Sequence, residues 1–256
     1  MRAEHIYSEI WSLFESSRSV VISSHARVDG DALGSMLALR SVLLDMGKTV
    51  RLVHADPVPE LLRYLADWQT VSSPADIPVD ETYDLGVVLD SGTIARLHEA
   101  EPIVRRASKL VNIDHHRDWE DFGGLNLIDT RAAAVGEILG ELFDWAEIDI
   151  AAAAATALYT SIATDTGGFR YTNTTARTHR IAANLLDRGA DAQTVNQHLY
   201  SNRPLVEFRL LGSVLGTLEQ RCGGRVTWMS VDAKMLSETG ANLEHVEGFV
   251  NYPRSV

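Results

Sequence analysis

The sequence predicts an α/β fold: an open, mostly parallel, doubly wound sheet, followed by the start of a second α/β domain. Short β-rich runs alternate with longer helical patterns over residues 4–188, which is the order expected of strands joined by helices. The β-rich runs are apolar on consecutive residues rather than on alternate ones. That pattern is typical of parallel strands that are covered on both faces.

The first domain is expected to contain both β-rich and helical segments, and its last three segments are helical. Strands are predicted over residues 20–24, 49–54, 85–89, 110–113 and 125–128. Helices are predicted over residues 4–17, 32–46, 58–68, 133–145, 150–163 and 175–188. The helix over 32–46 has apolar residues at helical spacing (Leu33, Met36, Leu37), and Gly47 is placed to end it.

The pattern changes after Gly189. Residues 191–200 and 204–219 indicate helices, Cys222-Gly223-Gly224 indicates a turn, and residues 225–231 indicate a strand. We therefore expect a first domain over 1–188, a helical linker over 189–220 and an incomplete second domain over 221–256. The exposed edge of the last strand favours pairing with another chain, so a homodimer is one expected assembly.

Composition restricts the class of partner. The 256 residues carry 23 Lys and Arg against 35 Asp and Glu, a formal net charge of −12. Proteins that track long nucleic acids carry surplus Lys and Arg, so any nucleic-acid substrate should be short. The single cysteine, Cys222, favours a reducing compartment. No signal peptide is recognisable, and the longest apolar segment, 148–163, is short for a membrane span, so a cytoplasmic protein without a membrane partner is expected.

Three polar clusters directly follow predicted strands. They are His25, Asp29 and Asp31 after the first strand, Asp90 after the third, and Asp114-His115-His116 after the fourth. The carboxyl ends of parallel strands lie along one edge of a sheet, where ligands bind, so the clusters are expected to converge. A further acid, Asp165, follows the alanine-rich helix and precedes a Thr-Gly-Gly turn.

These residue types select a metal chemistry. Imidazoles and carboxylates without cysteine suit Mn²⁺, Mg²⁺, Fe²⁺ or Co²⁺ rather than a thiolate zinc site. The four carboxylates at positions 29, 31, 90 and 165 would balance two divalent cations. Together with His25 and His115 they are too many ligands for one ion, but suit two ions about 3.5–4 Å apart that share a carboxylate.

Each cluster taken alone has a purely structural explanation. An isolated Asp after a strand is usually a helix cap or a turn residue, and Asp29 and Asp31 could cap the next helix. Their joint occurrence at one sheet edge favours a site instead. The remaining histidines are expected on the surface or in packing: His5, His54, His98, His179, His198 and His245.

The motifs resemble a known superfamily. His25-x-x-x-Asp29-x-Asp31, Asp90, Asp114-His115-His116 and Asp165-Thr-Gly resemble motifs I to IV of the DHH phosphoesterases. Segments 165–175 and 247–254 resemble the DHH/DHHA1 branch of bacterial nano-RNases (oligoribonucleases) that also dephosphorylate pAp. The resemblance implies that residues 221–256 begin a DHHA1-like domain. This sequence stops before the glycine-rich, histidine-containing segment that usually ends that domain, so a weak grip on nucleotide ends is expected.

The resemblance also implies a role for each site residue. One ion would be bound by His25, Asp29 and Asp90, and the other by Asp31, Asp90, His115 and Asp165. His116 would face the scissile phosphate, and Asp114 would orient the histidines. The two divalent cations are usually Mn²⁺, with Mg²⁺ or Co²⁺ as alternatives.

The implied substrates are short oligonucleotides (nano-RNA and linear dinucleotides such as pApA) and 3′-phosphoadenosine 5′-phosphate (pAp). Arg170, Arg203 and Arg254 are candidate contacts to phosphate or base, or alternatively solvated surface charges. A manganese-dependent inorganic pyrophosphatase shares the four motifs, but its basic Ser-Arg-Lys-Lys-type segment has no counterpart here. A non-catalytic nucleotide-binding DHH module would have no need for the complete ligand set.

Overall fold

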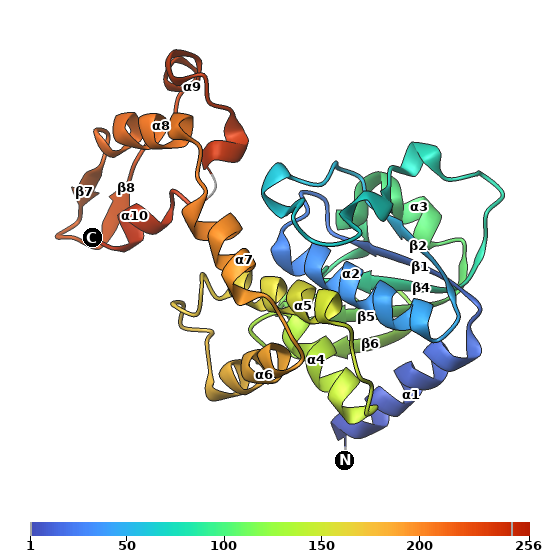
Figure 1. The fold of residues 1–256 in the computed structure, drawn as a ribbon. Coiled ribbons are helices and arrows are strands. Elements are labelled where there is room, and N and C mark those ends of the chain that lie inside the picture. The colour runs from blue at the N-terminus through green and yellow to red at the C-terminus, as the bar shows by residue number, and fades with distance from the viewer. Residues whose placement is uncertain (1, 247) are drawn as a thin grey trace. The chain divides into compact units, whose positions relative to one another are not determined.

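The computed structural model describes residues 2–246 and 248–256, so Glu247 of the C-terminal motif lies outside the described residues. The chain forms two compact units, Met1–Leu199 and Tyr200–Val256, and the division falls within the segment predicted as a linker. Figure 1 shows the elements of both units.

The first unit is built on a sheet of six strands. They are β1 (Ser19–Ser24), β2 (Thr49–Val53), β3 (Val71–Ser72), β4 (Tyr83–Leu89), β5 (Ala107–Asp114) and β6 (Leu125–Ile128). Their order is β3-β2-β1-β4-β5-β6, and every neighbouring pair is parallel. The predicted open, parallel, doubly wound sheet is confirmed. The order reverses between β1 and β4, which is the position where ligands bind in sheets of this kind.

Consecutive residues of the central strands enter different cores. Val20 and Ile22 of β1 belong to the core on one face of the sheet, whereas Val21 belongs to the core on the other. The larger core is covered by α1 (Arg2–Ser16), α2 (Gly30–Asp45), α4 (Val135–Trp145) and α5 (Ala152–Asp165). The smaller core is covered by η4 (Ile94–Ala100) and α3 (Glu101–Val104). Burial on both faces explains the uninterrupted apolar runs.

Helices α2 and α5 pack against each other at unusually short range. A side chain at Gly34 of α2 would overlap the carbonyl oxygen of Ala157 in α5, and one at Gly30 would overlap Thr164. Glycine in α2 and alanine in α5 therefore permit the close approach. The contact brings the first turn of α2, with Asp31, beside the last turn of α5, with Asp165.

The prediction of a helix over residues 58–68 is wrong. The structure has only the 3₁₀ turns η1 (Glu60–Leu62) and η2 (Trp68–Thr70) there, with Asp67 in the left-handed region at a φ of 64°. A residue with the left-handed backbone of Asp67 cannot belong to a right-handed helix, so the segment is divided into separate turns. Leu62 and Leu65 are buried at a spacing of three residues, which imitated the helical pattern.

The helices predicted over 175–188 and 191–200 are present as α6 (Ala176–Asp187) and as α7 (Ala192–Asn196) with the turn that follows it, whereas η3 (Pro74–Asp76) was not predicted. The turn after α7 is π-helical, η5 (Gln197–Ser201), and reaches the second unit. A capping box at Thr175 starts α6, because its hydroxyl accepts from the backbone of Thr178.

The second unit contains helices and one antiparallel hairpin. Its elements are α8 (Leu205–Leu215), β7 (Glu219–Arg221), β8 (Val226–Trp228), α9 (Ala233–Thr239), η6 (Leu243–Val246) and α10 (Asn251–Arg254). The predicted helix over 204–219 thus ends early, because the chain after Gly216 extends into β7, and β7 pairs with β8. The turn at Cys222-Gly223-Gly224 is confirmed. Whether residues 221–256 form a DHHA1-like domain stays a prediction.

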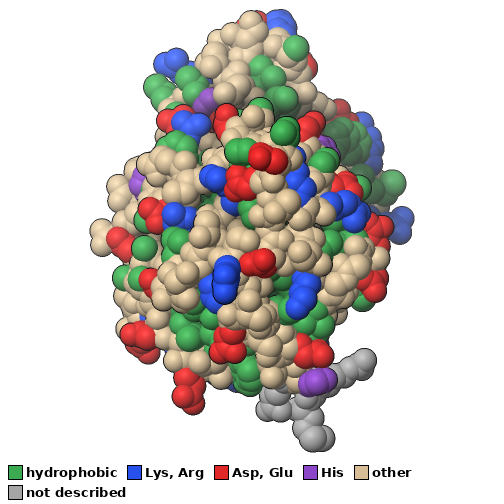
Figure 2. All heavy atoms as spheres, turned by 90° about the vertical axis from the view of Figure 1, so that its right-hand side faces the viewer, with side chains coloured by type: hydrophobic (Ala, Val, Ile, Leu, Met, Phe, Trp, Pro, Cys, Tyr) green, Lys and Arg blue, Asp and Glu red, His purple; other side chains and the backbone are tan. Residues whose placement is uncertain are grey.

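The distribution of charged side chains on the surface is consistent with the net negative charge of the sequence. On the face drawn in Figure 2, the described acidic and basic side chains are interspersed and form no continuous basic track. A long polyanion would need such a track. In the part of the chain that the structure describes, no helix combines the length and hydrophobicity needed to cross a membrane.

Candidate active site

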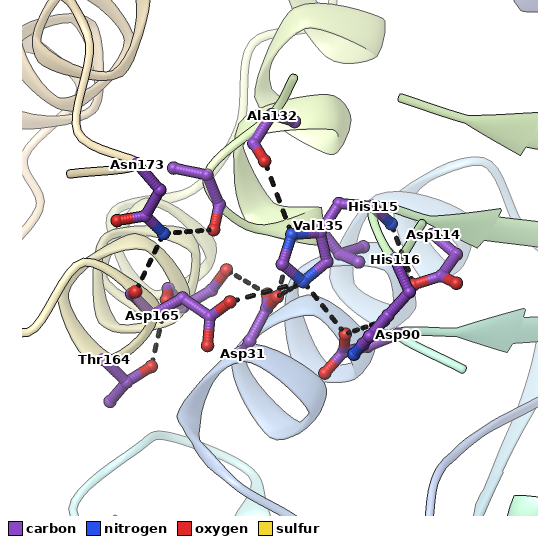
Figure 3. A network of polar contacts seen from close by, with 12 residues as sticks. Asp31, Asp90, Asp114, His115, His116, Ala132, Val135, Thr164, Asp165 and Asn173 are labelled. Atoms are coloured by element: carbon purple, nitrogen blue, oxygen red, sulfur yellow. Dashed lines mark hydrogen bonds and ion pairs between the residues drawn. The ribbon is translucent and has the colours of Figure 1, made fainter. Parts of the chain in front are cut away.

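Strand register brings the polar clusters together. Ser24 at the end of β1 pairs with Leu89 of β4, and Leu89 pairs with Ile113 of β5. The next residue of each strand segment is therefore His25, Asp90 or Asp114, side by side at the carboxyl edge. Figure 3 shows several of these side chains pointing toward one another. All the predicted metal ligands and both predicted catalytic residues meet here: His25, Asp29, Asp31, Asp90, Asp114, His115, His116 and Asp165.

One group of ligand atoms surrounds the His25 imidazole. Its Nε2 lies 3.1 Å from Oδ2 of Asp90 and 3.7 Å from Oδ2 of Asp29. Its Nδ1 lies 2.8 Å from the carbonyl oxygen of Ala26, which fixes the ring. Asp29 also caps α2, because its Oδ1 accepts from Ala32 N at 3.0 Å. The capping role considered for Asp29 therefore coexists with a place in the cluster.

A second group surrounds the His115 imidazole. Its Nε2 lies 3.3 Å from Oδ2 of Asp165, 3.6 Å from Oδ2 of Asp31 and 3.4 Å from Oδ1 of Asp90. Asp165 reaches this position from the end of α5, and Asp31 from the start of α2. The two groups correspond to the two ligand sets that the sequence motifs imply.

Asp90 lies between the two groups. Its Oδ2 faces His25, and its Oδ1 faces His115. The residue is only 2% exposed, and Oδ1 has no hydrogen bond of acceptable geometry. Its backbone is in the left-handed region, with a φ of 55°, which is rare outside glycine and is often found at functional sites. A buried carboxylate oxygen without a donor is the position at which a cation would be bound.

Asp31 is held by donors that the sequence analysis did not anticipate. Oδ2 accepts from Val135 N at 2.8 Å, and Oδ1 accepts from Ser161 Oγ at 2.5 Å. Ser35 Oγ and Gly136 N donate to the same Oδ1 at 3.2 and 3.3 Å. The backbone amides of Val135 and Gly136, the first residues of α4, thus hold the fully buried Asp31 carboxylate in place. The only signal in the sequence was the polar interruption of the alanine-rich segment at Thr160-Ser161.

Asp114 is placed to orient the two histidines that follow it. Its Oδ1 accepts from His115 N at 2.8 Å and lies 2.7 Å from Nδ1 of His116. The His116 side chain is 38% exposed, against 15% for His115. His115 is therefore turned into the cluster, whereas His116 is the more accessible of the pair.

Burial and like charges shift two carboxyl groups, Asp31 and Asp165, toward their protonated forms, whereas for Asp90 the hydrogen bonds and charges of His115 and His25 outweigh burial and lower the pKa. Burial and the nearby Asp90 charge raise the pKa of Asp31, and burial with the charges of Asp31 and Asp90 raises that of Asp165. Burial alone would lower the pKa of His25, but the hydrogen bonds to Asp29 and Asp90 outweigh it and raise the pKa to about 10. Asp31, Asp165 and His25 thus tend to hold protons that a bound cation would have to displace.

The donor set fits divalent cations. Nitrogen and oxygen ligands without sulfur suit the harder divalent metals. In the described residues, candidate ligand atoms form three groups in which all atoms lie within 4.8 Å of one another. Asp90 belongs to the groups with His25 and Asp29 and with Asp114, His115 and His116, and the third group is Asp31, His115 and Asp165. Asp90 approaches this third group through His115, whose Nε2 lies 3.4 Å from its Oδ1. A carboxylate between two ligand groups is the arrangement that a pair of cations requires.

The predicted arginines lie outside these groups. Arg170 is exposed on the turn after Asp165, and its Nε donates to the carbonyl oxygen of Gly167 at 2.6 Å. Arg203 and Arg254 belong to the second unit, where Arg203 pairs with Glu207 at 3.4 Å. Their roles as substrate contacts stay predictions.

Two further polar residues support the site. His54, expected on the surface or in packing, is 2% exposed, and its Nε2 donates to the carbonyl oxygen of His25 at 2.8 Å. Asn173 Nδ2 donates to the carbonyl oxygen of Asp165 at 3.0 Å (Figure 3). His54 follows β2 as His25 follows β1, and that position at the sheet edge was the signal that could have revealed it.

The parallel sheet, the position of the cluster at the switch point and its imidazole and carboxylate ligand atoms are the features of a metal-dependent phosphoesterase. Residues 19–162 match the model of the family described as "DHH family, N-terminal domain". The chain belongs to the DHH family, as its motifs predicted.

Relatives and solved structures agree with this assignment. The chain is 36% identical over 93% of its length to the bifunctional oligoribonuclease and PAP phosphatase NrnA of Thermus thermophilus, and spans 69% of that protein. It is 30% identical over 70% of its length to the probable counterpart of Streptococcus mutans, of which it spans 56%.

A crystal structure of an exopolyphosphatase-related protein from Bacteroides fragilis superimposes with a TM-score of 0.89 at 25% identity. The match covers 98% of this chain and 76% of that one. A putative family II inorganic pyrophosphatase of Methanococcus jannaschii, with a TM-score of 0.55 at 12% identity, shares the fold. That match covers 86% of this chain and 75% of the other.

Proposed function

We propose that this chain is a two-metal phosphoesterase that hydrolyses short oligonucleotides, linear dinucleotides such as pApA, and pAp. The observation that carries the proposal is Asp90, whose two carboxylate oxygens face two separate imidazole–carboxylate groups. The names of the Thermus and Streptococcus relatives, oligoribonuclease and PAP phosphatase, supply the substrate class.

The site residues are proposed to form two cation-binding sites. His25, Asp29 and Asp90 would hold one cation, and Asp31, Asp90, His115 and Asp165 the other. Bound there, two divalent cations would lower the pKa of a water molecule and neutralise negative charge on the phosphoryl group. Mn²⁺ is the proposed ion, with Mg²⁺ or Co²⁺ as alternatives, because the ligands are nitrogen and oxygen.

His116 is the proposed substrate contact and catalytic residue. Asp114 holds its Nδ1, so Nε2 is the nitrogen left to reach a phosphate oxygen or the leaving group. The greater exposure of His116 relative to His115 supports this division of roles. Arg170, Arg203 and Arg254 are proposed as further phosphate or base contacts, and a cytoplasmic location is proposed from the composition.

One assay separates the candidate activities. Equal concentrations of pApA, pAp and pyrophosphate are incubated with the protein and Mn²⁺, with and without excess chelator. We expect hydrolysis of pApA and pAp that disappears with chelator, and little release of phosphate from pyrophosphate. Preferential cleavage of pyrophosphate would show that the chain is a pyrophosphatase. If no substrate is hydrolysed, the proposal that the chain is an enzyme is contradicted.

A further inference from the structure

A cavity of about 410 Å³ opens beside the site, at the carboxyl ends of β2 and β3. It lies within the first unit and outside the imidazole–carboxylate groups. Its size falls in the range of small-molecule pockets, about 300–1,000 Å³. The lining residues that matter here are His54, Asp56, Val58, Arg63, Trp68 and Asp76.

His54 and Asp56 join this cavity to the loop that carries His25. His54 Nε2 donates to the carbonyl oxygen of His25 at 2.8 Å. Asp56 Oδ2 accepts from Arg27 N at 2.6 Å, where Arg27 has a left-handed backbone with a φ of 61°. The cavity wall and the metal-ligand loop are therefore one hydrogen-bonded unit. Neighbouring strands lie about 4.8 Å apart, a distance that the link between a phosphate and its nucleoside can span, so a nucleotide with its phosphate at His25 could reach this cavity.

The lining suits an uncharged aromatic ligand with hydrogen-bond donors. The Arg63 guanidinium lies over one face of the Trp68 ring, 5.1 Å from its centroid, and both planar groups line the cavity, where a base could stack on the pair. Val58 is a buried apolar neighbour. The carboxylates of Asp56 and Asp76 outnumber the single Arg63 cation, so a phosphate is disfavoured there. Amino groups of a base and ribose hydroxyls would instead donate to the carboxylates.

We propose that this cavity binds the nucleoside of the nucleotide whose phosphate lies at the imidazole–carboxylate groups. The base stacks on the pair formed by Trp68 and Arg63, and its amino group or the ribose hydroxyls donate to Asp56 and Asp76. The position of the phosphate rests on the proposed function, but binding of an uncharged nucleoside does not require catalysis. Trp68 and Asp76 then determine specificity for nucleotides over phosphate esters that lack a nucleoside.

The direct test is a calorimetric titration of the whole chain with adenosine. Trp68→Leu keeps apolar bulk but removes the stacking surface, and should weaken adenosine binding by about tenfold. Asp76→Asn, at an exposed position, should also weaken it, whereas the exposed Asp80→Asn in the following loop, outside the cavity lining, should match wild type. Thermal melts verify that each variant is folded. If Trp68→Leu is unfolded, adenosine binding by Asp76→Asn tests the proposal instead. Absent adenosine binding, or equal binding by all variants, overturns the proposal.

A second readout separates this proposal from the proposed function. The ratio of kcat/KM for pApA to that for bis(p-nitrophenyl) phosphate, which has no nucleoside, should fall about tenfold in Trp68→Leu through a higher KM for pApA. If the enzyme is active but this ratio is unchanged, nucleoside binding by the cavity is refuted and the proposed function is not. A wild-type protein that cleaves neither ester with Mn²⁺ contradicts the proposed function, and the adenosine titration then decides the cavity by itself.

Discussion

Asp90 is the residue on which both halves of the site depend. Its oxygens lie 3.1 Å from the His25 ring and 3.4 Å from the His115 ring, and it is almost completely buried. Asp90→Ala should lower kcat/KM for pApA by far more than tenfold, because it removes the ligand that the two proposed cations would share. The exposed Asp80→Ala is the matched control for removing a carboxylate. Activity of Asp90→Ala within tenfold of wild type would refute a shared ligand.

The two adjacent histidines should separate binding from turnover. His116→Ala should reduce kcat by at least about tenfold, because it removes an acid–base or charge-stabilising group, and should retain its bound Mn²⁺. His115→Ala should lose one equivalent of Mn²⁺, since its Nε2 lies within the second ligand group. Metal analysis of the two purified variants is the measurement. The reverse pattern would mean that the roles of the histidines are exchanged.

At the scale of elements, the packing of α5 on α2 determines how firmly Asp31 is held. Ser161→Ala removes a hydroxyl that donates to Asp31 and accepts from Gly136 N at 2.9 Å. It should cost about 1–3 kcal/mol of unfolding free energy, because buried polar groups lose their partner, and should also weaken Mn²⁺ binding. Denaturant unfolding and Mn²⁺ titration check both effects. Ser12→Ala, which removes an exposed hydroxyl of α1, should change neither, and equal behaviour of the two variants would contradict the role of Ser161.

The elements also explain what the sequence could and could not predict. Consecutive apolar residues identified β1, β4 and β5, and the ends of these strands located His25, Asp90 and Asp114, because side-chain burial and strand ends are local properties. Ser35, four positions along α2, is a local donor to Asp31, but Val135, Gly136 and Ser161 donate from more than a hundred positions away, and no local pattern encodes such contacts. The helix predicted over 58–68 failed because Leu62 and Leu65 are buried by turns rather than by a helix face.

At the scale of the whole molecule, cation binding should stabilise the fold in a pH-dependent way. Cations that bind only the native site add about 2.7 kcal/mol at a concentration of 100 Kd. Hydrogen bonds to Asp29 and Asp90 raise the pKa of His25 to about 10, so it is protonated at neutral pH in the absence of metal and must lose that proton to bind one. Competition by protons weakens as pH rises, so Mn²⁺ affinity should increase from pH 6 to pH 8.

Thermal melts across this pH range measure the effect. The increase in Tm on adding a fixed concentration of Mn²⁺ should be larger at pH 8 than at pH 6, and smaller in Asp29→Asn than in wild type. Asp80→Asn serves as the charge-matched control. A Tm that does not respond to saturating Mn²⁺ at either pH would argue against a preformed site.

The most direct test of the central claim is anomalous X-ray scattering at the manganese edge, from crystals grown with Mn²⁺. The account predicts two anomalous peaks about 3.5–4 Å apart, on either side of the Asp90 carboxylate. One peak should be bound by His25 and Asp29, and the other by Asp31, His115 and Asp165. A single peak at full occupancy, or two peaks that do not share Asp90, would contradict a two-metal phosphoesterase.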